Sequence, residues 1–77
     1  MLGRHVYRVH SEDGRWTVLK EGEDRPRGTF VNRSEAVSEA ARLAGSDQPS
    51  KVVIDNGDGT LGEEQLFGAD PGENIGA

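Results

Sequence analysis

The chain has 77 residues, no cysteine and a formal net charge of −5. A chain of this length forms one domain around one small core, since folds of this size bury only about 60% of the surface of the unfolded chain. The absence of cysteine excludes a disulfide framework and thiolate metal ligands, so apolar packing or a partner must stabilise the fold. No apolar run approaches the roughly 20 residues that span a bilayer, and residues 1–10 lack the pattern of a secretory signal. We therefore expect a cytoplasmic protein without a membrane partner.

Charge is unevenly distributed along the chain. Residues 1–33 carry seven Arg or Lys and five Asp or Glu, whereas residues 34–77 carry two and nine. The acidic total opposes the nonspecific attraction to phosphate on which most nucleic-acid-binding proteins rely. The basic N-terminal half still leaves room for a local basic surface, so nucleic acid is a secondary hypothesis for the partner.

The first half of the chain predicts three strands. HVYRVH (residues 5–10) and RWTVLK (15–20) alternate apolar and polar side chains and flank the turn SEDG, which predicts a hairpin. GTFV (28–31) predicts a short third strand after the polar loop EGEDRPRG. Successive side chains of a strand point to opposite faces. One face should therefore be apolar, with Tyr7, Val9, Trp16, Val18 and Phe30, and the other polar, with Arg8, Arg15 and Thr17.

A helix is predicted to begin at NRSE, residues 32–35. This is the pattern of a capping box, in which Asn32 accepts from the backbone N–H of Glu35 and the Glu35 carboxylate reaches back to the N–H of Asn32. Gly45 is placed to end the helix in the left-handed conformation.

The apolar stripe of this helix is mostly alanine. Small side chains let a helix lie close to a sheet, so large groups must come from the sheet to fill the interface. We expect Trp16 and Phe30 to do this. The alternative for Trp16 is an exposed stacking platform for a base or a peptide, flanked by cations. The stripe consists of Ala36, Val37, Ala40, Ala41, Leu43 and Ala44.

The second half predicts a hairpin and a tail. KVVID (51–55) is short, β-branched and bounded by turn residues, NGDG favours a tight turn, and TLGEEQLF (60–67) predicts a weaker fifth strand. The predicted fold is a single α+β domain in the order β-β-β-α-β-β, with an antiparallel sheet and one helix packed on one face. Residues 1–66 form this domain, and residues 67–77, rich in Gly and acidic side chains, are expected to be a mobile tail.

Five segments follow one another in the order and spacing of a known family: HVYRV, DGRWTVLKEG, SEAVSEAARLAG, VVIDNGDGTL and FGADP. The chain resembles, over residues 5–71, the small uncharacterised prokaryotic proteins grouped as "domain of unknown function 2188". Two positions depart from that pattern, because Arg15 separates Gly14 from Trp16 and Phe67 stands where the family usually has tyrosine. The resemblance implies the fold and assigns no activity. A small repeated β-β-β-α family is similar in the first half but leaves the NGDG hairpin unexplained.

Metal and enzyme chemistry have little support in the sequence. Asp55 followed by NGDGT superficially suggests a calcium loop, but Gly57 and Gly59 then fall at ligand positions, so a hairpin turn is favoured. His5 and His10 are five residues apart, which sends them to opposite faces of a strand. There is no nucleophile elbow and no phosphate-binding glycine loop. We expect no enzymatic activity, no cofactor and no metal.

The function favoured by these observations is a small noncatalytic protein-interaction or assembly module. The small core and an open last strand favour self-association into a homodimer. The competing hypothesis is a nucleic-acid-binding accessory protein that uses the polar face of the sheet. Its candidate anion or phosphate contacts are Arg8, Arg15, Arg25, Arg27 and Arg33; the alternative for these arginines is a solubilising surface paired with Glu21, Glu23 and Asp24.

Overall fold

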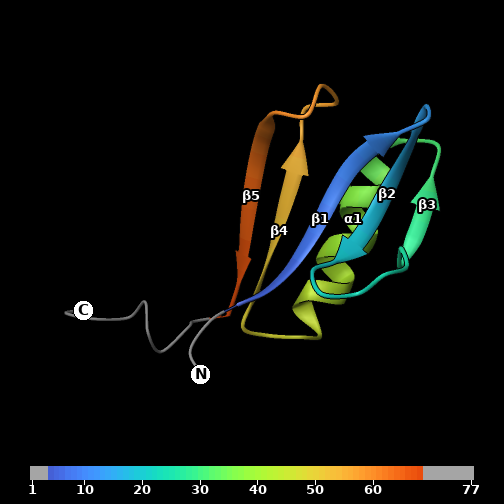
Figure 1. Cartoon of the computed structure of the whole chain (residues 1–77). Coiled ribbons are helices and arrows are strands. Elements are labelled where there is room, and N and C mark those ends of the chain that lie inside the picture. The colour runs from blue at the N-terminus through green and yellow to red at the C-terminus, as the bar shows by residue number, and fades with distance from the viewer. Residues whose placement is uncertain (1–3, 69–77) are drawn as a thin grey trace.

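The structure, a computed structural model, describes residues 4–68 as one helix packed on a five-stranded sheet (Figure 1). The β-β-β-α-β-β order predicted from the sequence is confirmed. The elements are β1 (His5–Glu12), β2 (Arg15–Lys20), β3 (Gly28–Phe30), α1 (Arg33–Gly45), β4 (Ser50–Asp55) and β5 (Leu61–Phe67). No helix of the described residues is long and apolar enough to cross a membrane.

The prediction of an antiparallel sheet is wrong, because the sheet is mixed. The strand order is β3-β2-β1-β4-β5, and β4 pairs with β1 in parallel, with Tyr7 opposite Val52 and Val9 opposite Ile54. The other three pairs are antiparallel. The parallel pair arises because α1 carries the chain back along the sheet after β3, so that β4 starts at the same end as β3 and β1. The second hairpin is thereby added beside β1, which becomes the central strand.

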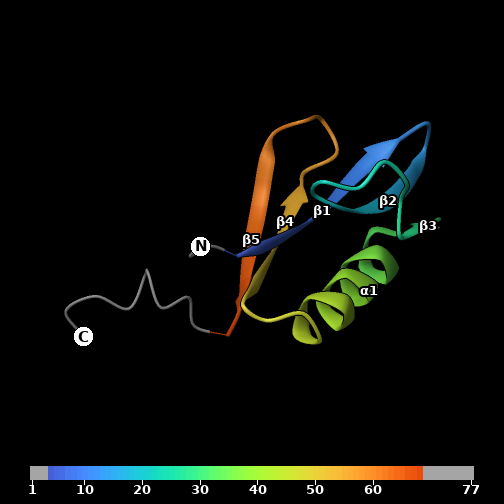
Figure 2. The same cartoon turned by 60° about the horizontal axis from the view of Figure 1, so that its bottom comes forward.

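Helix α1 covers one face of the sheet, and Figure 2 shows it on that side alone. Its start agrees with the prediction, since Asn32 is the N-cap residue, but the capping box is not formed. The Asn32 amide donates to the Glu35 carboxylate instead, at 2.9 Å. The helix ends at Gly45 as predicted, but the left-handed conformation predicted there is wrong, because Gly45 is not among the glycines with positive φ. The C-cap residue is Ser46, with a φ of −92°, and its N–H donates to the carbonyl of Leu43.

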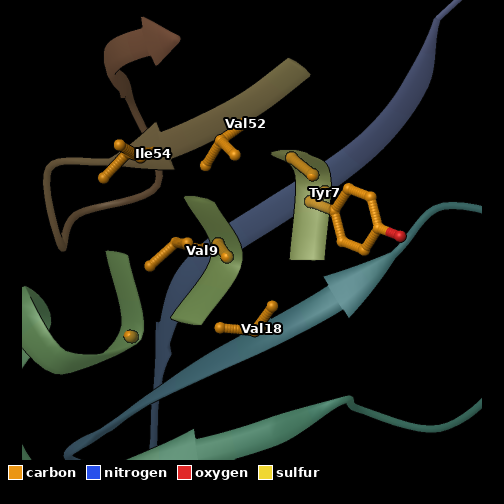
Figure 3. Packing of buried hydrophobic residues seen from close by; sticks show 8 residues of the cluster. Tyr7, Val9, Val18, Val52 and Ile54 are labelled. Carbon is orange, nitrogen blue, oxygen red and sulfur yellow. The ribbon is translucent and has the colours of Figure 1, made fainter. Parts of the chain in front are cut away.

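The core lies between α1 and the sheet. Ala36, Ala40 and Ala44 are fully buried, and their methyl groups let the helix approach the strands closely. The centre of the interface is filled by Tyr7, Val9, Val18, Val52 and Ile54, whose side chains gather beneath the helix in Figure 3.

Trp16 and Phe30 lie on the predicted face, but they are only partly buried and pack against the rim of this cluster. The expectation that these two aromatics fill the interface is therefore wrong in part. The reason is the parallel placement of β4, which brings Val52 and Ile54 under the centre of the helix.

The ends of the sheet nearest the termini are joined by Arg4. Its Nη1 donates to the carbonyl oxygens of Ser50, Phe67 and Gly68, at 3.0, 3.1 and 2.9 Å. One guanidinium thus ties the start of β1 to β4 and to the end of β5. β5 includes Phe67, the residue at which the tail was predicted to begin, and the predicted mobility concerns mainly residues 69–77, which lie outside the described residues.

Candidate functional site

The face of the sheet opposite α1 is covered by no helix of residues 4–68, and it faces the viewer in Figure 1. The strand registers determine which side chains it carries, because partners across a ladder point to the same side. We call this surface the open face. It carries Val6, Arg8, Leu19, Lys51, Val53, Asp55, Leu61, Glu64 and Leu66.

The centre of the open face is apolar. Val53, opposite Arg8 on β1, is only 8% exposed although no helix covers it, and Val6 is half-buried beside it. On β5, Leu61 and Leu66 are 61% and 57% exposed. Together with Val31, they are the large apolar side chains most exposed among the described residues. The polar face predicted for the first three strands is thus extended by β4 and β5, which give it an apolar centre.

Two ion pairs frame the apolar centre. Arg8 Nη2 lies 3.2 Å from Glu21 Oε2, and Lys51 Nζ lies 3.5 Å from Glu64 Oε2. These four side chains line an open hollow together with Val6 and Val53. Each of the four keeps between 32% and 55% of its side chain exposed, so these charges can re-pair with groups of a bound partner.

The loop between β2 and β3 closes one side of the open face. Thr17 belongs to this face by its register with His10, yet it is only 5% exposed. Thr17 and Pro26 of the loop line one hollow, so the loop lies beside this part of β2. The accessible part of the open face is therefore centred on β1, β4 and β5.

The five arginines proposed as anion contacts are not brought together. Arg8 and Arg15 lie on strands of the open face, Arg25 and Arg27 in the loop before β3, and Arg33 at the start of α1 on the opposite side. Three of them face carboxylates, since Arg8 pairs with Glu21, Arg27 binds both carboxylate oxygens of Glu23, and Arg33 lies 4.0 Å from Glu63. Within residues 4–68, ion pairs involve neither Arg15 nor Arg25.

Trp16 is placed by Arg33 and by the turn that follows β4. The Arg33 guanidinium lies 5.9 Å from the centre of the indole ring, and its Nε donates to the carbonyl of Asp55 at 3.5 Å. The edge of the ring approaches Gly57, where an added Cβ would lie 3.6 Å from it. The indole thus packs between the start of α1 and the β4–β5 turn, a structural position that favours the core role over a stacking platform.

A polar cluster anchors the loop after α1. Asp47 accepts from the Tyr7 hydroxyl at 2.8 Å and pairs with Lys20 Nζ at 2.8 Å, while His5 Nε2 lies 3.7 Å away. The ammonium of Lys20 and then the hydroxyl of Tyr7 lower the pKa of Asp47. Burial, followed by the bond to Asp47, raises the pKa of Tyr7, and the same carboxylate raises the pKa of Lys20. Because Asp47 is already bound on both sides, this cluster is an anchor for the loop.

The predicted hairpin turn between the last two strands is confirmed. The N–H of Asn56 donates to the carbonyl of Thr60. Gly57 and Gly59 adopt φ angles of 109° and 90°, a backbone conformation that residues other than glycine rarely adopt. The Asp58 carboxylate accepts from the N–H and the hydroxyl of Thr60. These bonds lower the pKa of Asp58. The side chain of Asp58 thus stabilises the turn.

Other ligand arrangements are equally sparse in the described part of the chain. His5 and His10 lie on opposite faces of β1, as their spacing predicts. Among residues 4–68, no group of three or more His, Cys, Asp or Glu side chains is placed to hold a metal ion.

The sequence does contain a signal for the apolar centre of the open face. Val52, Val53 and Ile54 are consecutive, so one of the three must point away from the helix. A continuous apolar run is typical of a strand that is buried on both faces, as in parallel sheets. The sequence contains no such signal for Leu61 and Leu66, which are five residues apart and would lie on opposite faces of a regular strand. They share the open face because the register is irregular between Ile54 and Asp55.

The fold and the open face define the class of protein: a small two-layer α+β domain whose mixed sheet has one face covered by a helix. The chain belongs to the family described as "Uncharacterized protein conserved in bacteria (DUF2188)", whose model matches residues 4–67. This confirms the resemblance identified from the sequence. No curated protein and no solved structure matches the chain.

Proposed function

We propose that the protein is a noncatalytic protein-interaction or assembly module that binds through its open face. The observation that carries the proposal is the apolar centre of this face. Leu61 and Leu66 are more than half exposed there, beside half-buried Val6 and buried Val53, and two ion pairs line the adjoining hollow. An apolar centre within a polar rim is the usual anatomy of a protein interface. Exposed apolar patches that are rimmed by polar residues mark sites of protein–protein interaction.

The competing role, binding of nucleic acid through the same face, has weaker support. Phosphate binding depends on cations that are available to release counterions. Arg8 and Arg27 each face a glutamate, and Arg33 lies on the side of α1. Arg15 on β2 and Arg25 in the loop before β3 remain as candidate contacts.

The proposal is tested by site-specific photo-crosslinking in bacterial extract. A photoreactive side chain at position 66 probes the open face, and the same side chain at position 31 is the matched control, since Val31 is 76% exposed and lies between β3 and α1. Protein adducts that form from position 66, and that are lost in a Leu61→Ser variant, support the proposal. Equal labelling from both positions contradicts it.

Binding of nucleic acid is tested in a separate titration. A labelled duplex and a labelled single strand are titrated with the protein at low salt and at high salt. Salt-sensitive binding that is lost in an Arg15→Ala/Arg25→Ala variant would replace the protein-interaction role with the nucleic-acid role.

A further inference from the structure

We propose that the partner which the open face fits is a second copy of this chain, bound face to face with the two sheets stacked. This inference rests on the proposed function and names its partner. It also specifies the face of the sheet, whereas the open edge of the last strand was the feature that favoured a dimer from the sequence.

A symmetric dimer places the same surface on both sides of its interface, so a self-associating face must carry groups that match one another. The open face meets this condition. Its apolar centre can lie on an identical apolar centre, and each copy carries both a basic and an acidic side chain within each of its two ion pairs, Arg8 with Glu21 and Lys51 with Glu64. Either cation can therefore meet a carboxylate of the other copy.

Charge also disfavours other partners for this face. A nucleic acid or an acidic peptide would meet Glu21, Asp55 and Glu64 in the hollow, against only two cations, Arg8 and Lys51. A strongly basic peptide would be attracted by the three carboxylates and repelled by the two cations, whereas a second copy offers both signs of charge. The chain as a whole carries a net charge of −5, so two copies repel one another least where positive and negative side chains alternate, as they do here.

The edges of the sheet are less suited to self-association than its face. β5 carries Glu63 and Glu64 at its centre, and pairing of β5 with its own copy would place these carboxylates close together. The opposite edge, β3, is only three residues long. Acidic or short edge strands are common means by which proteins avoid edge-to-edge pairing.

The size of the face predicts a weak dimer. Three accessible strands at a spacing of about 4.8 Å, each about six residues long, give a surface of roughly 15 Å by 20 Å, or roughly 300 Å² per copy. The total of roughly 600 Å² lies below the range of stable complexes and at the small end of transient ones. Association should therefore be reversible and visible only at high protein concentration.

The test exploits the mixed charge of the face. A cationic variant (Glu21→Lys/Glu64→Lys) and an anionic variant (Arg8→Glu/Lys51→Glu) each lose self-complementarity but complement one another. Sedimentation equilibrium of the full chain, from about 10 µM to about 1 mM, should show a monomer–dimer equilibrium for the wild type. Each variant alone should remain monomeric, and an equimolar mixture should form heterodimers at least tenfold more tightly than the wild type forms homodimers.

Two controls keep the result interpretable. Reversal of a pair on the exposed side of α1, in a Glu39→Arg/Arg42→Glu variant, should leave the dimer unchanged, because these residues lie far from the open face. Far-ultraviolet circular dichroism and thermal melting establish that the charge variants are folded.

Three results would overturn the inference. These are a wild type that stays monomeric at the highest concentration, charge variants that self-associate as well as the wild type, and a mixture that does not associate. The proposed function fails separately, if photo-crosslinking from position 66 yields neither a homodimer nor any other protein adduct. A monomeric wild type that still forms face-dependent adducts retains the function and loses only the self-partner.

Discussion

Replacement of Asp47 by Asn should lower stability at neutral pH and leave it nearly unchanged in acid. The carboxylate holds the Tyr7 hydroxyl and the Lys20 ammonium, each at 2.8 Å, and so fixes the loop after α1 to β1 and β2. Asparagine keeps an oxygen acceptor for Tyr7 but removes the charge that pairs with Lys20. Because the side chains of Asp47 and Lys20 are 30% and 22% exposed, solvent screens part of this pair.

The expected loss at about pH 7 is about 1 kcal/mol, which is the net value of one hydrogen bond to a partly screened charged group. For a domain of this size it lowers the melting temperature by about 4–8 °C. The direction of the pH dependence follows from the pKa. The pKa of Asp47 is lower in the folded state, so its contribution is complete above the ordinary value of 3.8 and is lost as the pH falls through the folded value.

Urea unfolding of wild type and Asp47→Asn, followed by circular dichroism between about pH 2 and pH 9, measures the difference directly. The two proteins should differ by about 1 kcal/mol on the plateau and converge as the pH falls below the folded pKa of Asp47, which lies below 3.8. Glu39→Gln is the matched control. The pKa of Glu39 is also lowered, in this case by Arg42, but Arg42 is 66% exposed, so solvent screens this ion pair more strongly. A constant difference at every pH, or an equal effect of Glu39→Gln, would refute the reasoning.

Three further substitutions test the fold. Ile54→Ala removes a fully buried side chain under α1 and should cost about 3–4 kcal/mol, measured as a lower urea midpoint at unchanged slope. Trp16→Ala removes a partly buried indole from the rim of the core and should cost about 2–3 kcal/mol; a cost near zero would show that Trp16 does not pack against the domain. Arg4→Ala leaves three carbonyl oxygens without the guanidinium and should cost about 1–3 kcal/mol, with faster amide hydrogen exchange at the end of β5, whereas unchanged exchange there would contradict its role in joining the strands.

The elements of this fold can be predicted from local sequence, because each has its own period and its own turn chemistry. The alternation of apolar and polar side chains in residues 5–10 and 15–20 predicts the first hairpin. The helical spacing of alanines predicts the helix, and the turn sequence Asn-Gly-Asp-Gly predicts the second hairpin. The errors at the helix ends are also local. A cap residue can be identified from its type, but which hydrogen bond it makes depends on competing donors, as the Asn32 amide shows.

The arrangement of the two hairpins cannot be predicted in the same way. Nothing near β4 indicates that it pairs with β1, more than 40 residues earlier, and in parallel. The role of Asp47 cannot be predicted locally either. Its position in the sequence indicates only a loop, whereas its hydrogen-bond partner Tyr7 lies 40 residues away in the chain. The run Val52, Val53 and Ile54 is the one local sign of a central strand with apolar side chains on both faces.

The distribution of burial separates folding from binding in this molecule. The largest fully buried side chains, Val9, Val18, Val52 and Ile54, all point toward α1, so the core is complete without a cover on the open face. This differs from the argument from chain length, in which a small core favours a dimer for its stability. Leu61 and Leu66 are more than half exposed in the single chain, and polar substitutions there should change stability by less than about 0.5 kcal/mol. Loss of association in a Leu61→Ser/Leu66→Ser variant would therefore report on the interface itself, whereas a variant that unfolds would show that the open face is part of the core.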